Sequence, residues 1–232
     1  MLFDLRSRRR KGAVRVIYVF LAVIMAAGLI GAGVGTGTGG GLLNGLIGSG
    51  SGGGSQNNLS NQQVQAALKR TKQHPDSASA YSALILARWS AAGSSSDFNS
   101  TTGQFSAEGK QQLRAAGQDW TRYLALTNDQ PAVQTSNIAA RIFQDLSQWS
   151  AAASAWEYAA QSYSAGSPDG LSSYFCMSLN SYAAGQASKG EAAEAQVLKL
   201  APKLRRLQLK STLSQAKASA STAQQAVVTN CS

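Results

Sequence analysis

Few side chains in this sequence are of the kinds that carry out chemistry. The only histidine is His74, directly before Pro75 at an expected helix end, where a polar or cationic side chain near the last carbonyl groups is ordinary. Among the eleven acids, only Glu191 and Glu194 have a spacing suited to acid–base catalysis or metal binding, and they fit an exposed helix face better. The sequence therefore predicts no enzyme, no cofactor and no metal site.

The two cysteines have three possible fates. Cys176 lies in an apolar stretch and Cys231 is the penultimate residue, so they form a disulfide, a buried thiol or a free thiol in the tail. An oxidising compartment favours pairing. A frayed chain end, however, has no evident reason to dock beside the helix that carries Cys176. Two cysteines alone cannot build a zinc site, and the sequence leaves the question of pairing open.

The positive charge of the chain is concentrated at its two ends. The formal net charge is +10, from 21 bases and 11 acids in 232 residues. Six bases lie in residues 1–15 and six follow residue 198, whereas residues 16–198 carry nine bases and ten acids. A nucleic-acid-binding domain would cluster its bases on a folded face. The near-neutral middle of the chain therefore predicts no nucleic-acid partner.

An apolar run near the N-terminus predicts a single membrane span. Residues 13–34 contain one charge and otherwise only apolar or small side chains, and at ~1.5 Å per residue they cross a ~30 Å hydrocarbon core. A cleavable signal peptide is the competing interpretation, but its apolar core is usually shorter. The bases beside the span are expected to hold a cytoplasmic tip, residues 1–12, inside, so that everything after residue 35 lies outside the cytoplasmic membrane. These bases are Arg8, Arg9, Arg10 and Lys11.

A flexible linker is predicted over residues 35–58, because eleven of its 24 residues are glycine. A chain of this length lets the outer domain sample about 25 to 30 Å from the membrane. Ordered structure is expected to begin near Leu59, where Ser60 as N-cap and Gln63 three residues later form a capping box.

Beyond the linker the apolar residues advance by three or four positions, which predicts an all-α domain. One such series is Trp149, Ala153, Trp156, Ala160 and Tyr163, and no segment alternates with period two. The tryptophans could serve as platforms for sugars or peptides, but their place in these helical series favours core packing. The four tryptophans are Trp89, Trp120, Trp149 and Trp156.

The four prolines indicate a repeat. Pro75, Pro131, Pro168 and Pro202 are separated by 56, 37 and 34 residues. A helix-turn-helix unit of about 34 residues closed by proline has the period of the tetratricopeptide repeat. The longer first interval is one unit with an insertion of roughly 22 residues, visible as the polar, glycine-rich stretch 91–103.

Residues 60–203 resemble a tetratricopeptide-repeat protein of the bacterial envelope. The best match is Tyr182–Gln186 followed by Gly190–Glu194 and ending in Leu200–Lys203. The resemblance implies a stack of antiparallel helix pairs over residues 59–203, whose concave face binds peptides or protein segments. In its layout the chain is also similar to the ancillary subunit of the bacterial secretion translocon, which cooperates with periplasmic chaperones.

A basic helix is expected to end the domain. Residues 199–225 predict one long helix with Leu200, Leu204 and Leu207 inward, and residues 204–232 would cap the stack. The sequence thus predicts a membrane-tethered scaffold or chaperone-like adaptor for a protein or peptide client. The alternative is an envelope-assembly module that binds a wall polymer or acidic lipid through this helix. The bases expected to make that contact are Lys203, Arg205, Arg206 and Lys210.

Overall fold

The computed structural model describes residues 55–164 and 166–231. The predicted cytoplasmic tip, the predicted span 13–34 and the linker up to residue 54 lie outside the described residues. Within the described ranges, none of the helices combines the length and the apolar character that a membrane crossing requires.

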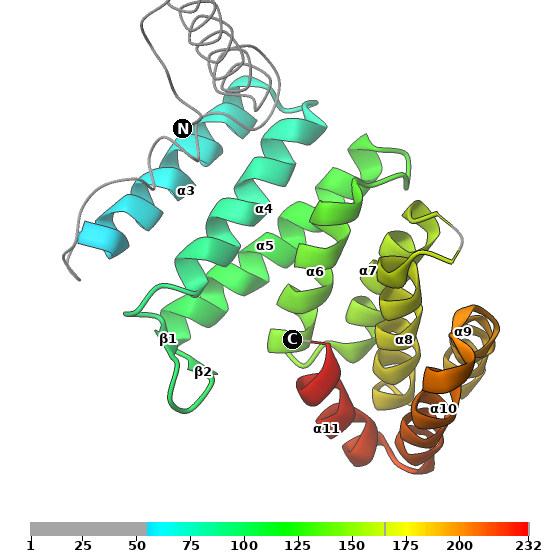
Figure 1. The fold of residues 1–232 in the computed structure, drawn as a ribbon. Helices are drawn as coiled ribbons and strands as arrows, with labels where there is room; N and C mark the ends of the chain where they lie inside the picture. Colours follow the sequence, from blue (N-terminus) through cyan, green and yellow to red (C-terminus); the bar gives the residue numbers. More distant parts are fainter. Residues whose placement is uncertain (1–54, 165, 232) are drawn as a thin grey trace, which may run out of the picture. The chain divides into compact units, whose positions relative to one another are not determined.

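The described residues form nine helices and one small β-hairpin (Figure 1). The elements are α3 (Ser55–Gln73), α4 (Ala78–Ala92), β1 (Phe98–Asn99), β2 (Gln104–Phe105), α5 (Ala107–Leu126), α6 (Val133–Asp145), α7 (Trp149–Ser162), α8 (Pro168–Ala183), α9 (Ala187–Leu200), α10 (Lys203–Ala218) and α11 (Ala220–Asn230). The prediction of an all-α domain is confirmed for this part of the chain.

The first described helix begins earlier than predicted. Helix α3 starts at Ser55, so Ser60 lies inside the helix and is not its N-cap. The capping-box prediction was wrong because residues 55–58 are polar but contain no glycine. The helix therefore extends back to Ser55. The glycines before it disfavour further helix, because ordering their backbone costs the most entropy.

Three of the prolines mark the start of a helix pair. Pro131 precedes α6, Pro168 is the first residue of α8, and Pro202 caps α10. Proline suits these places because the first turn of a helix has no intrahelical use for its N–H group. Within each pair the connection is short, residues 146–148 between α6 and α7 and residues 184–186 between α8 and α9. Such short connections turn the chain back on itself, and the paired helices pack together.

The connection between α4 and α5 carries the hairpin. Strands β1 and β2 pair antiparallel with Phe98 opposite Phe105, and the two rings lie 4.8 Å apart between centroids. This stretch overlaps the predicted insertion. Gly109 of α5 holds it close, because a Cβ at this position would lie 2.8 Å from the Asp97 carbonyl oxygen. The two-residue strands are too short to produce a recognisable alternation in the sequence.

Helix α8 is the centre of the core. It packs against α7, α9, α10 and α11, and every residue from Phe175 to Ala183 is buried. One continuous apolar cluster runs from Ile85 of α4 to Cys231 at the chain end. Many of its members are alanines, which let neighbouring helices approach closely. A smaller cluster joins α3 to α4.

The predicted terminal helix over residues 199–225 was wrong. Helix α9 ends at Leu200, and extended backbone at Ser219 (φ −158°, ψ 150°) separates α10 from α11. Leu204 and Leu207, expected inward, are 97% and 80% exposed. The inward face of α10 instead carries Leu213 and Ala216, which are buried, because these residues and not the earlier leucines face α8 and α9. Residues 203–230 still form a terminal element that covers α8.

Close packing joins α8 to α9. A Cβ at Gly190 would lie 2.5 Å from Cε1 of the Tyr182 ring, so only glycine fits this position without a shift of the ring. The Tyr182 hydroxyl donates to Glu194 (2.6 Å). Burial and the adjacent Glu194 carboxylate raise the pKa of Tyr182, so the phenol stays protonated and keeps donating.

We expect Gly190→Ala to destabilise the domain although alanine is the better helix former. Alanine gains about 1 kcal/mol of helix propensity, but overpacking against a buried ring costs ~1 to 3 kcal/mol and the Tyr182–Glu194 hydrogen bond is disturbed. Thermal melts of the full chain by circular dichroism measure the net loss. Gly93→Ala is the matched control, because its Cβ would meet only ordinary contacts at 3.6 Å and beyond. Equal midpoints for the two variants would contradict the packing argument.

Candidate functional site: interaction surfaces

Of the three candidate residues for chemistry, Glu191 and Glu194 make structural contacts through their side chains, and the side chain of His74 makes none within the described residues. His74 lies exposed beyond the end of α3. Glu191 forms an ion pair with Lys217 of α10 (2.5 Å), and Glu194 accepts the Tyr182 hydroxyl. Within residues 55–164 and 166–231, no group of three or more histidine, cysteine or acidic side chains is placed to hold a metal ion. The two glutamates thus connect α9 to its neighbours.

Cys176 and Cys231 form a disulfide, which decides between the alternatives left open by the sequence. The Cα atoms are 5.7 Å apart, and both residues are buried. The chain end is not frayed, because α11 is an ordered helix that buries Ala223 and Val227. The bond fastens the end of α11 to α8.

A buried polar network reinforces this junction. The Gln144 side-chain oxygen, with the amide oriented to suit its neighbours, accepts from Trp156 Nε1 (3.1 Å) and Asn180 Nδ2 (2.8 Å), and its NH₂ group donates to the Cys231 carbonyl (3.2 Å). Asn180 Nδ2 also donates to the Cys176 carbonyl (2.7 Å). One amide of α6 thereby connects α7, α8 and the chain end.

The tryptophans contribute mainly to the core. Trp120 and Trp156 are buried, with 4% and 6% of their surface exposed, which confirms the packing interpretation for both. Trp89 and Trp149 are half-buried and pack against the same cluster. The Trp120 ring lies edge-on to Tyr158 at 6.2 Å between centroids. Neither buried indole presents a platform to solvent.

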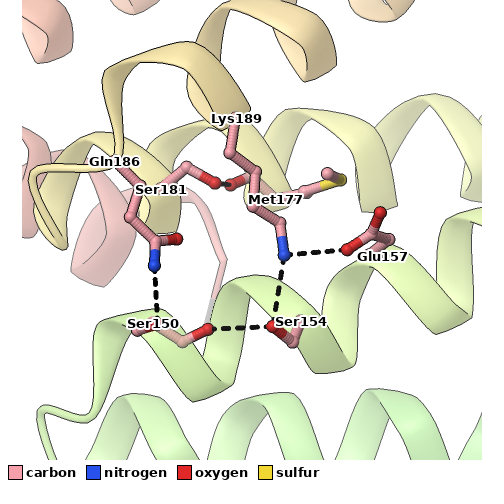
Figure 2. A network of polar contacts seen from close by, with 7 residues as sticks. All are labelled: Ser150, Ser154, Glu157, Met177, Ser181, Gln186 and Lys189. Atoms are coloured by element: carbon pink, nitrogen blue, oxygen red, sulfur yellow. Dashed lines mark hydrogen bonds and ion pairs between the residues drawn. The ribbon is translucent and has the colours of Figure 1, made fainter.

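A second polar network fastens α9 to α7 (Figure 2). Lys189 Nζ contacts Glu157 (2.8 Å) and Ser154 Oγ (3.1 Å), and Gln186 Nε2 donates to Ser150 Oγ (2.8 Å). Figure 2 shows these side chains reaching from the start of α9 across to α7. All of the charges in this network are paired, so it fixes the stacking of one helix pair on the next.

Helices α4 and α6 pack together and share an accessible face. The two helices are joined by a hydrogen bond between Ser82 and Thr135 (2.8 Å). Along each helix, exposed or half-buried residues follow one another at positions i, i+4, i+7 and i+11, which places them in one row. We call these rows the open face: Ser79, Ala83, Leu86 and Ser90 of α4 with Gln134, Ile138, Arg141 and Asp145 of α6. No sequence motif marks any of these residues.

The bases proposed for polymer or lipid contact all lie in the first two turns of α10. Lys203, Arg205, Arg206 and Lys210 are exposed. Arg206 donates to the Ala201 carbonyl (3.1 Å) and so helps to close the end of α9. Arg205 borders a pocket of about 230 Å³ between α8, α10 and α11. The pocket is lined by Pro168, Leu171, Ser172, Phe175, Arg205, Gln208, Leu209, Thr212 and Asn230. The four bases therefore do not converge on one point.

The described residues define an all-α protein built from stacked helix pairs. Its last pair, α10 and α11, is fastened to α8 by the disulfide. No family model, no curated protein and no solved structure matches the chain.

Proposed function

We propose that this protein is a membrane-tethered scaffold or chaperone-like adaptor outside the cytoplasmic membrane, with a tetratricopeptide-like domain that binds protein or peptide segments. The observation that carries this proposal is the position of the prolines relative to the helix pairs. From Pro131 onward each proline stands where a new helix pair begins, as a repeat of about 34 residues closed by proline requires. Stacked repeats of this kind present extended surfaces for binding and need no catalytic groups.

Two further features support a repeat of the tetratricopeptide kind. Gly185 turns the chain between α8 and α9 with φ +72°, a conformation that glycine adopts at little cost. Gly190 then lets α9 approach the Tyr182 ring closely, and Ala193 of the same helix is buried. The best sequence match to the repeat thus coincides with the glycine that has the least room for a Cβ among the described glycines.

The disulfide supports a location outside the cytoplasm. Disulfides persist in oxidising compartments and are rare in the cytosol. The bases Arg8, Arg9, Arg10 and Lys11 before the predicted span favour the same topology, since basic flanks stay inside. We therefore infer a single-pass protein of the cytoplasmic membrane, with the helical domain on the outer side.

We propose the open face of α4 and α6 as the surface that binds the client. In a stack of helix pairs the first helices of successive pairs form one side, which here consists of α4, α6 and α8. Helix α11 already packs on α8, where a client would otherwise lie. The rows on α4 and α6 remain accessible and combine serine hydroxyl groups, half-buried aliphatic side chains and the charged residues Arg141 and Asp145. Such a mixture suits an extended peptide better than a small ligand.

Site-specific photocrosslinking in living cells tests this proposal. We expect a benzophenone amino acid in place of Arg141, on the open face, to capture one or a few envelope proteins in the full chain. The matched control is the same substitution at Arg114, an exposed arginine on α5, the partner helix of α4. Products at position 141 that are absent at position 114 would support the proposal. The same products at both positions, or none at either, would reject it.

A further inference from the structure

Helix α10 exposes two leucines that no packing explains. Leu204 is 97% and Leu207 80% exposed, the two most exposed large apolar side chains among the described residues. They are three residues apart and so lie on the same side of the helix. The opposite side of α10 is the one that packs, through Leu213 and Ala216. The leucines therefore form an outward apolar strip on the side of α10 that does not pack against the stack.

Unpaired cations flank this strip. Lys203 precedes Leu207 by four residues and Lys210 follows it by three, which puts both ammonium groups beside the leucines. The ion pairs within the described residues are Arg88–Asp119, Arg122–Asp76, Lys189–Glu157 and Lys217–Glu191. Lys203, Arg205 and Lys210 take part in none of them, and the sequence contains no acid after Glu194. The outward side of α10 thus combines apolar side chains with uncompensated positive charge.

We propose that this outward side of α10 lies on the surface of an anionic lipid bilayer. We call it the lipid-facing side, made of Lys203, Leu204, Leu207 and Lys210. A helix that lies in a membrane interface needs an apolar strip that enters the headgroup region and bases that bind lipid phosphates. Both are present here on one side of two helical turns.

The leucines favour lipid over a wall polymer. A hydrophilic anionic polymer would satisfy the bases but would leave Leu204 and Leu207 in water. A bilayer accommodates both kinds of side chain, because the leucines reach the acyl boundary while the long basic side chains extend to the phosphates. Charge complementarity and apolar exposure thus point to the same occupant.

Because of the predicted tether, a weak contact between α10 and the bilayer is enough to keep this helix on the lipid surface. A linker such as residues 35–58 keeps the domain within ~25 to 30 Å of the bilayer, so contact is intramolecular and needs little intrinsic affinity. The lipid-facing side is separate from the open face of α4 and α6. The lipid contact therefore goes beyond the proposed function and stands or falls independently of client binding.

Electron paramagnetic resonance on the full chain in lipid vesicles tests the proposal. A nitroxide is attached to a ketone-bearing amino acid in place of Leu207, which leaves the disulfide intact, and collisions with oxygen and with a water-soluble nickel chelate are measured. In vesicles of phosphatidylcholine with phosphatidylglycerol we expect frequent oxygen and rare nickel collisions. In pure phosphatidylcholine vesicles we expect the reverse. A label at Gln196, exposed on α9, should report water in both.

Charge variants locate the contact. Each base near an anionic surface contributes about 1 kcal/mol, or roughly a fivefold change. Lys203→Gln with Lys210→Gln should therefore lower the ratio of inserted to detached label about 25-fold, and both positions are exposed, so folding is preserved. The matched control is Lys69→Gln with Lys72→Gln on α3, which removes the same charge from exposed positions and should leave the ratio unchanged.

Three results would overturn the proposal. The first is a label at position 207 that stays accessible to the nickel chelate in anionic vesicles. The second is an equal effect of both lysine pairs, which would indicate general attraction rather than this side of α10. The third is a label that meets water in vesicles but is immobilised in native membranes, which would assign the leucines to a protein partner.

Discussion

Replacing Cys176 and Cys231 together by alanine is expected to lower the free energy of unfolding by ~4 kcal/mol. The chain-entropy estimate for a bond that closes a loop of this size gives this value, because the two cysteines are 55 residues apart. Alanine is the appropriate replacement, since serine at the buried position 176 would add an unsatisfied hydroxyl. Thermal unfolding of the full chain, followed by circular dichroism, measures the loss.

The loss should begin at α11. This helix has eleven residues and, with Cys231 directly after it, adds little more than Ala223 and Val227 to the core. Without the crosslink its packing must offset the cost of ordering the whole segment. Hydrogen exchange followed by mass spectrometry should therefore show faster exchange in residues 220–230 of the variant, while α6 and α7 change less.

Reduction of the unaltered protein is the matched experiment. A reductant should lower the melting temperature of the native chain and leave the double alanine variant unchanged. If reduction and substitution both left the melting temperature and the exchange of α11 unaffected, helices α10 and α11 would be held by packing alone. The disulfide would then add nothing to the stability of these two helices.

Local periodicity made most of the helical domain predictable from the sequence. The spacing of Trp149, Ala153 and Trp156 follows the turn of a helix, and α7 spans these residues. The prolines could be placed because proline is tolerated only in the first turn of a helix or outside it. These signals depend on neighbours three or four positions away, which the sequence contains directly.

The C-terminal region was less predictable because two helical series compete there. Leu200, Leu204 and Leu207 have helical spacing, but so do Leu209, Leu213 and Ala216. Spacing alone cannot say which series faces the core, and contact with α8 and α9 decides for the second. The pairing of Cys176 with Cys231 depends on the same docking, so it too lay beyond local patterns.

The candidate surfaces were predictable only in part. The clustering of Lys203, Arg205, Arg206 and Lys210 is visible in the sequence, and their exposure follows from charge. Their lack of acidic partners and the exposure of Leu204 beside them depend on how α10 is rotated against the stack. The open face depends on the joining of α4 to α6, residues about 50 positions apart, and no short-range pattern encodes that contact.

Replacing Trp156 by alanine is expected to cost ~3 to 5 kcal/mol of stability, because removal of a large buried aromatic side chain leaves a cavity that the surroundings fill only in part. Trp156 is 6% exposed and belongs to the central cluster with Phe175 and Leu179. The substitution also removes the donor that Trp156 Nε1 offers to Gln144. Chemical denaturation of the full chain, followed by helical circular dichroism, gives the difference in free energy.

Two further variants separate the contributions to this loss. Trp156→Phe keeps an aromatic ring in the core but loses the hydrogen bond to Gln144, so it should cost less than the alanine variant, with about 1 kcal/mol of its loss from the hydrogen bond. Trp149→Ala removes a half-buried tryptophan from the same helix and should also cost less than Trp156→Ala, because part of that side chain is already in water. If Trp156→Ala loses more free energy of unfolding than Trp149→Ala, the loss is explained by the burial of the side chain.

The opposite outcome has a definite meaning. If Trp156→Ala melted like the unaltered protein but lost the crosslinked client, the indole would be a binding platform and not a packing residue. The junction of α6, α7, α8 and the chain end at Gln144 would then have to be held without it. Because Asn180 and the Cys231 carbonyl share the same amide, loss of Trp156 should instead weaken the attachment of α11. We therefore expect the alanine variant to speed hydrogen exchange in α11 as well as in α7.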